Sequence, residues 1–246
     1  MTSAVFLDLY RVLADPGLME KHYRERFASI LRRDFGIPLP KGRLIHDGTY
    51  AWYTNEGARL DSLQGDMREG EEWVRAVQRM EAEHMRLAFE MAGIPPPSNL
   101  NNFWVKFETE IVSGIDALYA DVPPALRELK AGGHRIFLST NATRSNAESA
   151  LVGGGVRDMF DGLVLLENAK AKKDRPHYWR RALNIMSVRP TEPFVVVDDI
   201  PAYLAAVSKM GARCFQMVRP EYTGMKIGTY PIITSLTELP TLLRTL

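Results

Sequence analysis

Two kinds of hydrophobic pattern divide the chain. Between about residues 15 and 115, apolar side chains recur three and four positions apart, which is the spacing of one face of an α-helix. Gly36, Gly93 and a run of three prolines at 95–97 interrupt this pattern, as expected where helices end. This part of the chain is therefore predicted to be all-helical, with helices over residues 16–35, 42–63, 70–91 and 101–115.

The rest of the chain alternates short apolar runs with helical segments. Short strands that are apolar on both faces, each followed by a helix, are typical of a parallel sheet covered by helices on both sides. The sequence thus predicts a Rossmann-like α/β domain from residues 1–14 and 116–246, interrupted by an all-helical cap domain at residues 15–115. Strands are predicted at residues 5–7, 134–139, 162–166, 194–197, 213–218 and 230–233, and helices at 122–129, 145–152, 175–187, 201–210 and 236–246.

Composition narrows the class of partner. The 246 residues are 46% hydrophobic and 25% charged, and the net charge of +1 argues against nucleic acid or an anionic membrane as the main partner. The single cysteine, Cys214, excludes an internal disulfide and a multi-cysteine zinc site. No run approaches the ~20 apolar residues that span a bilayer. We expect a cytoplasmic monomer or homodimer that acts on a small molecule.

Residues of types that can take part in catalysis or ligand binding follow four of the predicted strands. The carboxyl ends of parallel strands meet at one edge of a sheet, where α/β proteins bind ligands, so these residues can converge. Carboxylate oxygens with a backbone carbonyl suit Mg²⁺, a carboxylate can act as a nucleophile, and a lysine can neutralise the crowded acids. The four sets are Asp8, then Ser139-Thr140-Asn141, then the stretch 170–174 with three lysines, and then Asp198-Asp199.

In order and spacing, these segments resemble the four motifs of the haloacid dehalogenase-like (HAD) hydrolase superfamily, and the helical insert resembles that family's cap. The register of the third motif favours Lys172 over Lys170 and Lys173. The matching segments are Phe6–Leu13, Ile136–Asn141, Lys172–Tyr178 and Val195–Pro201.

The resemblance implies a role for each matching residue. Asp8 takes the place of the nucleophile and of a metal ligand, and the carbonyl of Tyr10 that of a backbone ligand. Asp199 resembles the acid that binds Mg²⁺ directly, and Asp198 an outer one. Thr140, with Asn141 beside it, resembles the group that binds the phosphoryl oxygens. Lys172 resembles the lysine that neutralises charge.

Tyr10 departs from the phosphatase pattern, because it stands where the family's phosphatases carry a second aspartate as general acid and base. A phenol with a pKa near ~10 is a poor base at neutral pH, and lost acid–base help costs ~10²–10⁴-fold in rate. The sequence favours a Mg²⁺-dependent hydrolase of phosphoryl or phosphonate substrates, weakened by this change.

Two alternatives stay open. The family's 2-haloacid dehalogenases also carry Tyr at this position and use no metal, because a halide needs no proton to leave. A catalytically impaired binding or scaffold protein would keep only the fold.

Several further residues have two interpretations. Arg11 replaces the usual glycine of the first motif, and either binds a substrate anion or pairs with an acid of the cap. His46, Tyr50, Trp52 and Tyr53 form either a substrate-facing surface of the cap or its internal packing.

Overall fold

The sheet is the centre of the protein. The computed structural model describes residues 3–62, 69–189 and 191–244, and these residues form a six-stranded parallel sheet in the order β3-β2-β1-β4-β5-β6. This confirms the predicted fold class. The strands are β1 (Ala4–Leu7), β2 (Arg135–Ser139), β3 (Gly162–Val164), β4 (Phe194–Asp198), β5 (Arg213–Met217) and β6 (Ile232–Ile233). The third strand is shorter than predicted because a short helix, α7 (Leu166–Ala169), begins directly after it.

Helices cover both faces of the sheet, as the doubly apolar strands predict. The β1 side chains alternate between two hydrophobic clusters, and all four are fully buried. Val5 and Leu7 belong to the cluster that includes α5 (Val122–Ala131), α6 (Arg144–Gly153) and α10 (Glu238–Arg244). Ala4 and Phe6 belong to the cluster that includes α8 (Pro176–Ile185) and α9 (Pro201–Ser208). A single 3₁₀ turn, η2 (Arg157–Met159), precedes β3.

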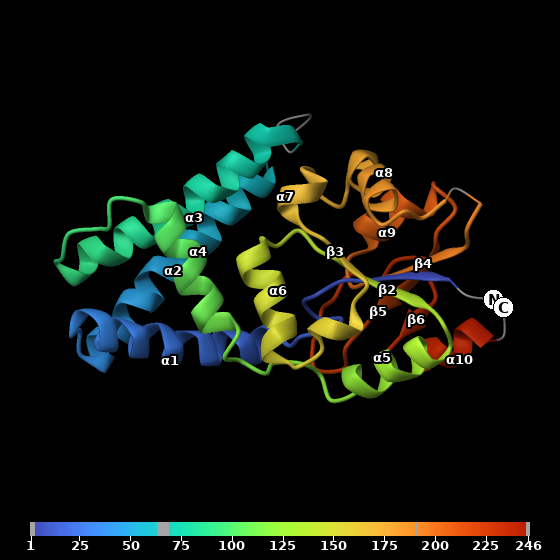
Figure 1. Ribbon diagram of the computed structural model, residues 1–246, viewed down its shortest axis with the longest axis horizontal. Coiled ribbons are helices and arrows are strands. Elements are labelled where there is room, and N and C mark those ends of the chain that lie inside the picture. Colours follow the sequence, from blue (N-terminus) through green and yellow to red (C-terminus); the bar gives the residue numbers. More distant parts are fainter. Residues whose placement is uncertain (1–2, 63–68, 190, 245–246) are drawn as a thin grey trace.

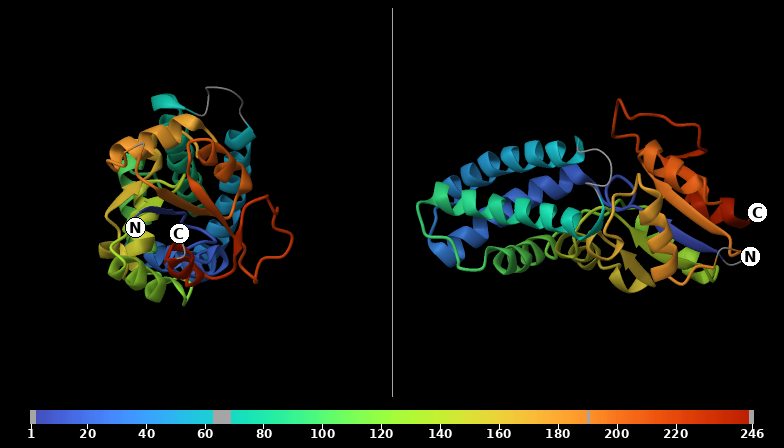
Figure 2. Two further views of the ribbon diagram at one scale, coloured as in Figure 1. Left: turned by 90° about the vertical axis from the view of Figure 1, so that its right-hand side faces the viewer. Right: turned by 90° about the horizontal axis from the view of Figure 1, so that it is seen from above.

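Four helices between β1 and α5 form the insert. Figures 1 and 2 show them side by side at one end of the molecule, extending away from the sheet, and they are consistent with a HAD-type cap. The bounds of α1 match the prediction because Asp15 caps its first turn and Gly36 ends it in a left-handed conformation, with φ 70°. The insert consists of α1 (Pro16–Phe35), α2 (Leu39–Ser62), α3 (Gly70–Ala92) and α4 (Leu100–Val112).

The insert and the sheet share one hydrophobic core. Phe27 of α1, Met85 of α3 and Ile111 of α4 belong to the same buried cluster as Leu7 and Val197 of the central strands. The apolar faces predicted for the cap helices are therefore used partly against one another and partly against the α/β layer. Among the described residues, no helix combines the length and the apolar character needed to cross a membrane.

The two connections between the sheet and the insert run side by side. The backbone N–H of Asp15 donates to the carbonyl of Ala117 at 2.8 Å, and the N–H of Tyr119 donates to that of Leu13 at 3.0 Å. The buried guanidinium of Arg219 donates to the Val12 carbonyl at 2.5 Å and to the carboxylate of Asp121 at 2.8 Å. The chain thus leaves and re-enters the α/β domain at one place, beside the loop that follows Asp8.

Candidate active site

The carboxyl ends of the central strands bring three carboxylates together. Asp8 follows β1, and Asp198 and Asp199 lie at the end of β4, which pairs with β1 in parallel. One carboxylate oxygen from each of the three residues lies within 4.8 Å of the other two. Hard oxygen ligands at this spacing suit Mg²⁺. The donor set therefore fits the metal that the sequence analysis expects.

Lys173 places one buried positive charge against this cluster. Its Nζ donates to Asp8 Oδ1 at 2.5 Å and to the Ser139 carbonyl at 2.9 Å, and it forms an ion pair with Asp198. Only 1% of its side chain is exposed. This corrects the sequence-based prediction, in which the register of the third motif favoured Lys172 as the charge-neutralising lysine. The backbone N–H of Lys173 is fixed by Asn141 Oδ1 at 3.0 Å, and its Nζ contacts both Asp8 and Asp198.

The buried charges shift one another's pKa values. Burial opposes ionisation of Lys173, but the charges of Asp198 and Asp8 outweigh it and raise the pKa of the lysine. Burial raises the pKa of Asp198, against the lowering influence of Lys173. Burial and then the charge of Asp8 also raise the pKa of Asp199. The site therefore holds more negative charge than Lys173 alone offsets, which favours a bound cation.

The hydroxyl of Tyr10 acts as a hydrogen-bond donor and is poorly suited to act as a general base. Its hydroxyl donates to Asn146 Oδ1 at 2.7 Å. Burial and the nearby charge of Glu108 raise the pKa of Tyr10 above the ordinary 10.0. The phenol therefore stays protonated and serves as a hydrogen-bond donor to Asn146.

Arg11 contacts an acid of the α/β domain. Its φ of 62° places a non-glycine residue in the left-handed region, at the position where the family usually carries glycine. Its guanidinium donates to Asp199 Oδ2 at 3.2 Å and lies 5.2 Å from the centre of the Tyr222 ring. The expected pairing with a cap acid is thus replaced by a pairing with Asp199. The side chain is 44% exposed, so it remains accessible to a substrate anion.

Thr140 and Asn141 lie at the end of β2, beside the carboxylates. Thr140 is buried, and its hydroxyl oxygen accepts the backbone N–H of Ala142 at 3.2 Å. Asn141 uses its side-chain oxygen to fix Lys173. Both residues line the same cavity as Asp8, which is where a phosphoryl-binding group is needed.

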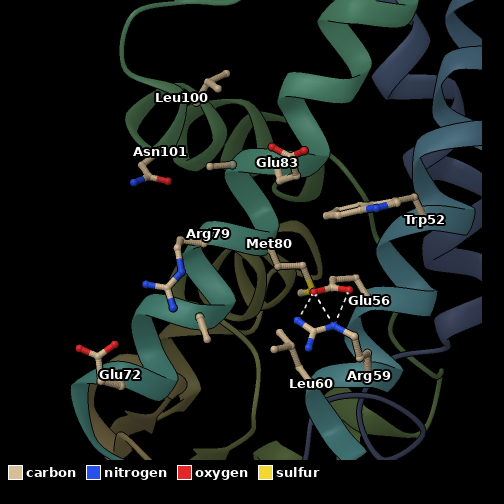
Figure 3. A pocket seen from close by; sticks show the side chains of 12 residues that line it. Trp52, Glu56, Arg59, Leu60, Glu72, Arg79, Met80, Glu83, Leu100 and Asn101 are labelled. Atoms are coloured by element: carbon tan, nitrogen blue, oxygen red, sulfur yellow. Dashed lines mark hydrogen bonds and ion pairs between the residues drawn. The ribbon is translucent and has the colours of Figure 1, made fainter.

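That cavity, of about 480 Å³, extends from the strand ends to the cap helices. Of the four cap residues singled out in the sequence, His46, Tyr50 and Tyr53 line it. Trp52 instead lines a separate cleft of about 750 Å³ between α2 and α3, shown in Figure 3, where Arg59 pairs with Glu56. None of the residues that line this cleft lines the cavity at Asp8.

Sequence reasoning missed two buried glutamates in the cavity wall. Glu81 of α3 accepts from the Thr143 hydroxyl at 3.1 Å, and Glu108 of α4 accepts from Ser145 at 2.5 Å and from the amide of Asn146 at 3.1 Å. These bonds join the cap to the start of α6. The signal was available, because each glutamate occupies a position in the apolar stripe of its helix, where a carboxylate is out of place.

Comparison with known proteins identifies the family. The model of the haloacid dehalogenase-like hydrolases matches residues 4–211, and the chain belongs to this hydrolase family. It is 31% identical over 125 residues to the enolase-phosphatase E1 of Frankia alni, covering 50% of this chain and about half, 52%, of that relative.

Solved structures share the fold at low sequence identity. The 2-haloacid dehalogenase from Pseudomonas syringae pv. Tomato DC3000 superposes with a TM-score of 0.66 at 19% identity, covering 100% of this chain and 99% of that one. The magnesium-bound HAD-hydrolase YfnB from Bacillus subtilis superposes with a TM-score of 0.61 at 15% identity, covering 98% of both chains. At these identities the likeness concerns the fold alone.

Proposed function

We propose that the protein is a Mg²⁺-dependent hydrolase of small phosphorylated or phosphonate-type substrates, with Asp8 as its nucleophile. The observation that carries this proposal is the cluster of Asp8, Asp198 and Asp199, with oxygens within 4.8 Å of one another. Paired acids after β4 have an evident use in holding a divalent cation and none in displacing a halide. The enolase-phosphatase similarity supports the same direction.

The chain's own residues suggest how the reaction would proceed. Lys173 holds the Asp8 carboxylate in place for attack on phosphorus. Thr140 and Arg11 are positioned to hold the oxygens of the transferring group. Asp8, Asp199 and Asp198 would hold Mg²⁺, with the Tyr10 carbonyl as the further ligand that the family motif implies; the ion would supply positive charge against the phosphoryl oxygens. As the bond from Asp8 to phosphorus forms, the ester P–O bond would break, and the departing alkoxide or phenoxide would take its proton from water where it needs one. Water would then hydrolyse the aspartyl phosphate, releasing phosphate and restoring the Asp8 carboxylate, and residues 15–115 would cover the site as a cap.

Loss of Asp8 tests the proposal directly. We expect Mg²⁺-dependent release of phosphate from 4-nitrophenyl phosphate, a generic aryl ester whose weakly basic leaving group tolerates the absence of a carboxylic acid at position 10. Asp8→Asn should lower kcat by about 10³-fold or more, because it removes the nucleophile. Asp158→Asn, an exposed aspartate on η2, is the matched control and should retain the wild-type rate. Full activity of Asp8→Asn, or activity unaffected by chelation of Mg²⁺, would refute the proposal.

Tyr10 supports a second candidate. A halide leaves without a proton, so a dehalogenase needs no acid at this position. That function predicts chloride release from short 2-chloro acids in the presence of a metal chelator, measured with a chloride electrode. A chain that releases neither phosphate nor chloride across such panels would instead be a binding or scaffold protein of this fold.

A further inference from the structure

The part of the active-site cavity formed by the cap is acidic. Glu81 and Glu108, exposed by only 5% and 4%, line it together with Glu20 of α1. The lining includes one basic side chain of lysine or arginine type, Arg11, which pairs with Asp199 at the opposite end. Among the described residues, the hydrogen-bond partners of the two buried glutamates are hydroxyl and amide groups, which supply no compensating charge.

Aromatic rings form another part of this wall. His46 lies between Tyr23 and Tyr50, with ring centres 5.8 and 5.4 Å apart. His84 lies in the same way between Tyr53 and Trp104, at 5.1 and 5.3 Å. Tyrosine and tryptophan faces attract cations, and the attraction strengthens where water is excluded.

Both histidines present a lone pair without a partner. Thr49 uses its hydroxyl proton on the Ile45 carbonyl at 2.9 Å, so it accepts from His84 Nε2 at 3.0 Å, and this leaves His84 Nδ1 as an acceptor. His46 Nδ1 donates to the carboxylate of Asp47 at 3.2 Å, which leaves His46 Nε2 as an acceptor. Among the described residues neither remaining nitrogen has a hydrogen-bond partner, although both rings are almost fully buried.

Burial lowers the pKa of both histidines, so both rings are neutral. Burial also raises the pKa values of Glu81 and Glu108, so the empty cavity favours their protonated forms. A cation in the cavity would favour their ionised forms. A wall of carboxylates and aromatic ring faces is complementary to a positively charged group.

We propose that the cap wall binds a primary ammonium group, so that among phosphate monoesters with similarly basic leaving groups the protein prefers those that carry an ammonium group, such as the phosphate of a small amino alcohol. This inference rests on the proposed phosphatase function. The phosphate would lie at Asp8 and Thr140, and the ammonium group at Glu81 and Glu108. A cavity of about 480 Å³ accommodates a small metabolite of this kind.

Matched pairs of esters test this inference. Short ω-aminoalkyl phosphates are compared with n-alkyl phosphates of the same number of heavy atoms, so that the charged N–H donors are the difference within each pair. We expect kcat/KM to be at least about tenfold higher for the amino ester. Glu81→Gln and Glu108→Gln should each reduce that ratio, whereas Glu110→Gln, an exposed glutamate on α4, should preserve it.

Calorimetry separates the two proposals. Binding of each pair to Asp8→Asn protein in Mg²⁺ should favour the amino ester by at least about tenfold, without requiring turnover or the glutamate variants to fold. Equal affinity within the pairs would overturn the ammonium inference, even if 4-nitrophenyl phosphate is hydrolysed. Preferential binding without phosphate release from any ester would instead overturn the phosphatase function, and the inferred substrate with it.

Discussion

Lys173 shows how much one position decides in this site. Between α7 and α8 the sequence contains three lysines in a stretch of four residues, at positions 170, 172 and 173. The spacing to the following helix cannot by itself show which of two neighbouring lysines points inward, because the chain between α7 and α8 is irregular. The structure directs Lys173 between Asp8 and Asp198. Removing this cation would leave buried carboxylates without their partner.

A comparison of two methionine variants tests this assignment. Lys173→Met should lower the hydrolysis rate by about 10²-fold or more, because charge at the reacting group is lost. It should also lower the free energy of unfolding by about 3–5 kcal/mol, the cost of breaking a buried ion pair. Lys172→Met is the comparison variant and should lower the hydrolysis rate much less, because Lys173 is the lysine that contacts Asp8 and Asp198. Phosphate release and urea unfolding provide the two readouts, and the reverse ranking would restore the register inferred from the motif.

Other residues of the site were accessible to sequence reasoning to differing degrees. The positions of Asp8, Thr140 and Asp199 follow from their places at strand ends, which all lie at one edge of a parallel sheet. The partner of Arg11 does not follow, because it depends on how two loops fold over one another. The unusual residue at position 10 was visible in the sequence, but its contact with Asn146 joins residues 136 positions apart.

At the scale of elements, α3 and α4 combine apolar packing with buried polar contacts. Their apolar stripes cover the core, yet each stripe contains one glutamate that faces Thr143, Ser145 or Asn146 at the beginning of α6. A glutamate can occupy a buried position of a helix without distorting the helix. Burial of its carboxyl group, however, opposes ionisation. The stability of this region should therefore depend on pH.

Glu108 gives the direction of that dependence. Burial raises its pKa from 4.5 in the unfolded chain to about 7 in the folded protein. Between these values the folded state binds more protons than the unfolded state, so the free energy of unfolding falls as pH rises. Glu108→Gln removes this titration. The variant should therefore gain on the order of 1–3 kcal/mol relative to the wild type between about pH 5 and pH 8.

Urea unfolding at several pH values measures this gain. Glu72→Gln, an exposed glutamate on α3, should follow the wild-type curve throughout. A Glu108→Gln curve parallel to that of the wild type would mean that the carboxyl does not titrate in this range.

The elements themselves were largely predictable. Glycine and proline residues at helix ends, together with apolar residues three and four positions apart, located all four cap helices. Such helices begin and end where local capping and one buried face dictate. The ends of α4 and β3 were set too far along, since an apolar run continues beyond each element into packed irregular chain. Residues 63–68, at the predicted end of the second helix, lie outside the described residues.

At the scale of the molecule, Arg219 joins the two connections to the insert. It bonds the Val12 carbonyl of the outgoing chain and the Asp121 carboxylate of the returning chain, and its guanidinium carbon lies 3.9 Å from the centre of the Tyr119 ring. The side chain comes from the loop after β5, far from both in sequence. One buried charge thus fixes the loop that follows Asp8 and the place where the chain re-enters the α/β domain.

Replacing Arg219 should therefore affect both stability and catalysis. Arg219→Met leaves the half-buried Asp121 without its charged partner, although Ser235 and Leu236 still donate to it, and should cost about 1.5–3 kcal/mol in the free energy of unfolding. It should also lower kcat, because the loop carrying Tyr10 and Arg11 loses its anchor. Arg213→Met removes an exposed arginine of β5 and is the control. Thermal and urea denaturation with phosphate-release assays check the result, and a loss of activity without a loss of stability would contradict an anchoring role.

The side-by-side connections have a consequence for how this protein can change over evolutionary time. The insert departs from the sheet and returns to it at adjacent residues, with backbone bonds between Asp15 and Ala117 and between Leu13 and Tyr119. Helices can therefore be lengthened, shortened or resurfaced beyond that junction without altering the register of the strands. Under the proposed function, the residues that perform the reaction and those that contact the rest of the substrate would lie in different stretches of one gene, so mutation could alter the insert while Asp8 stays in place.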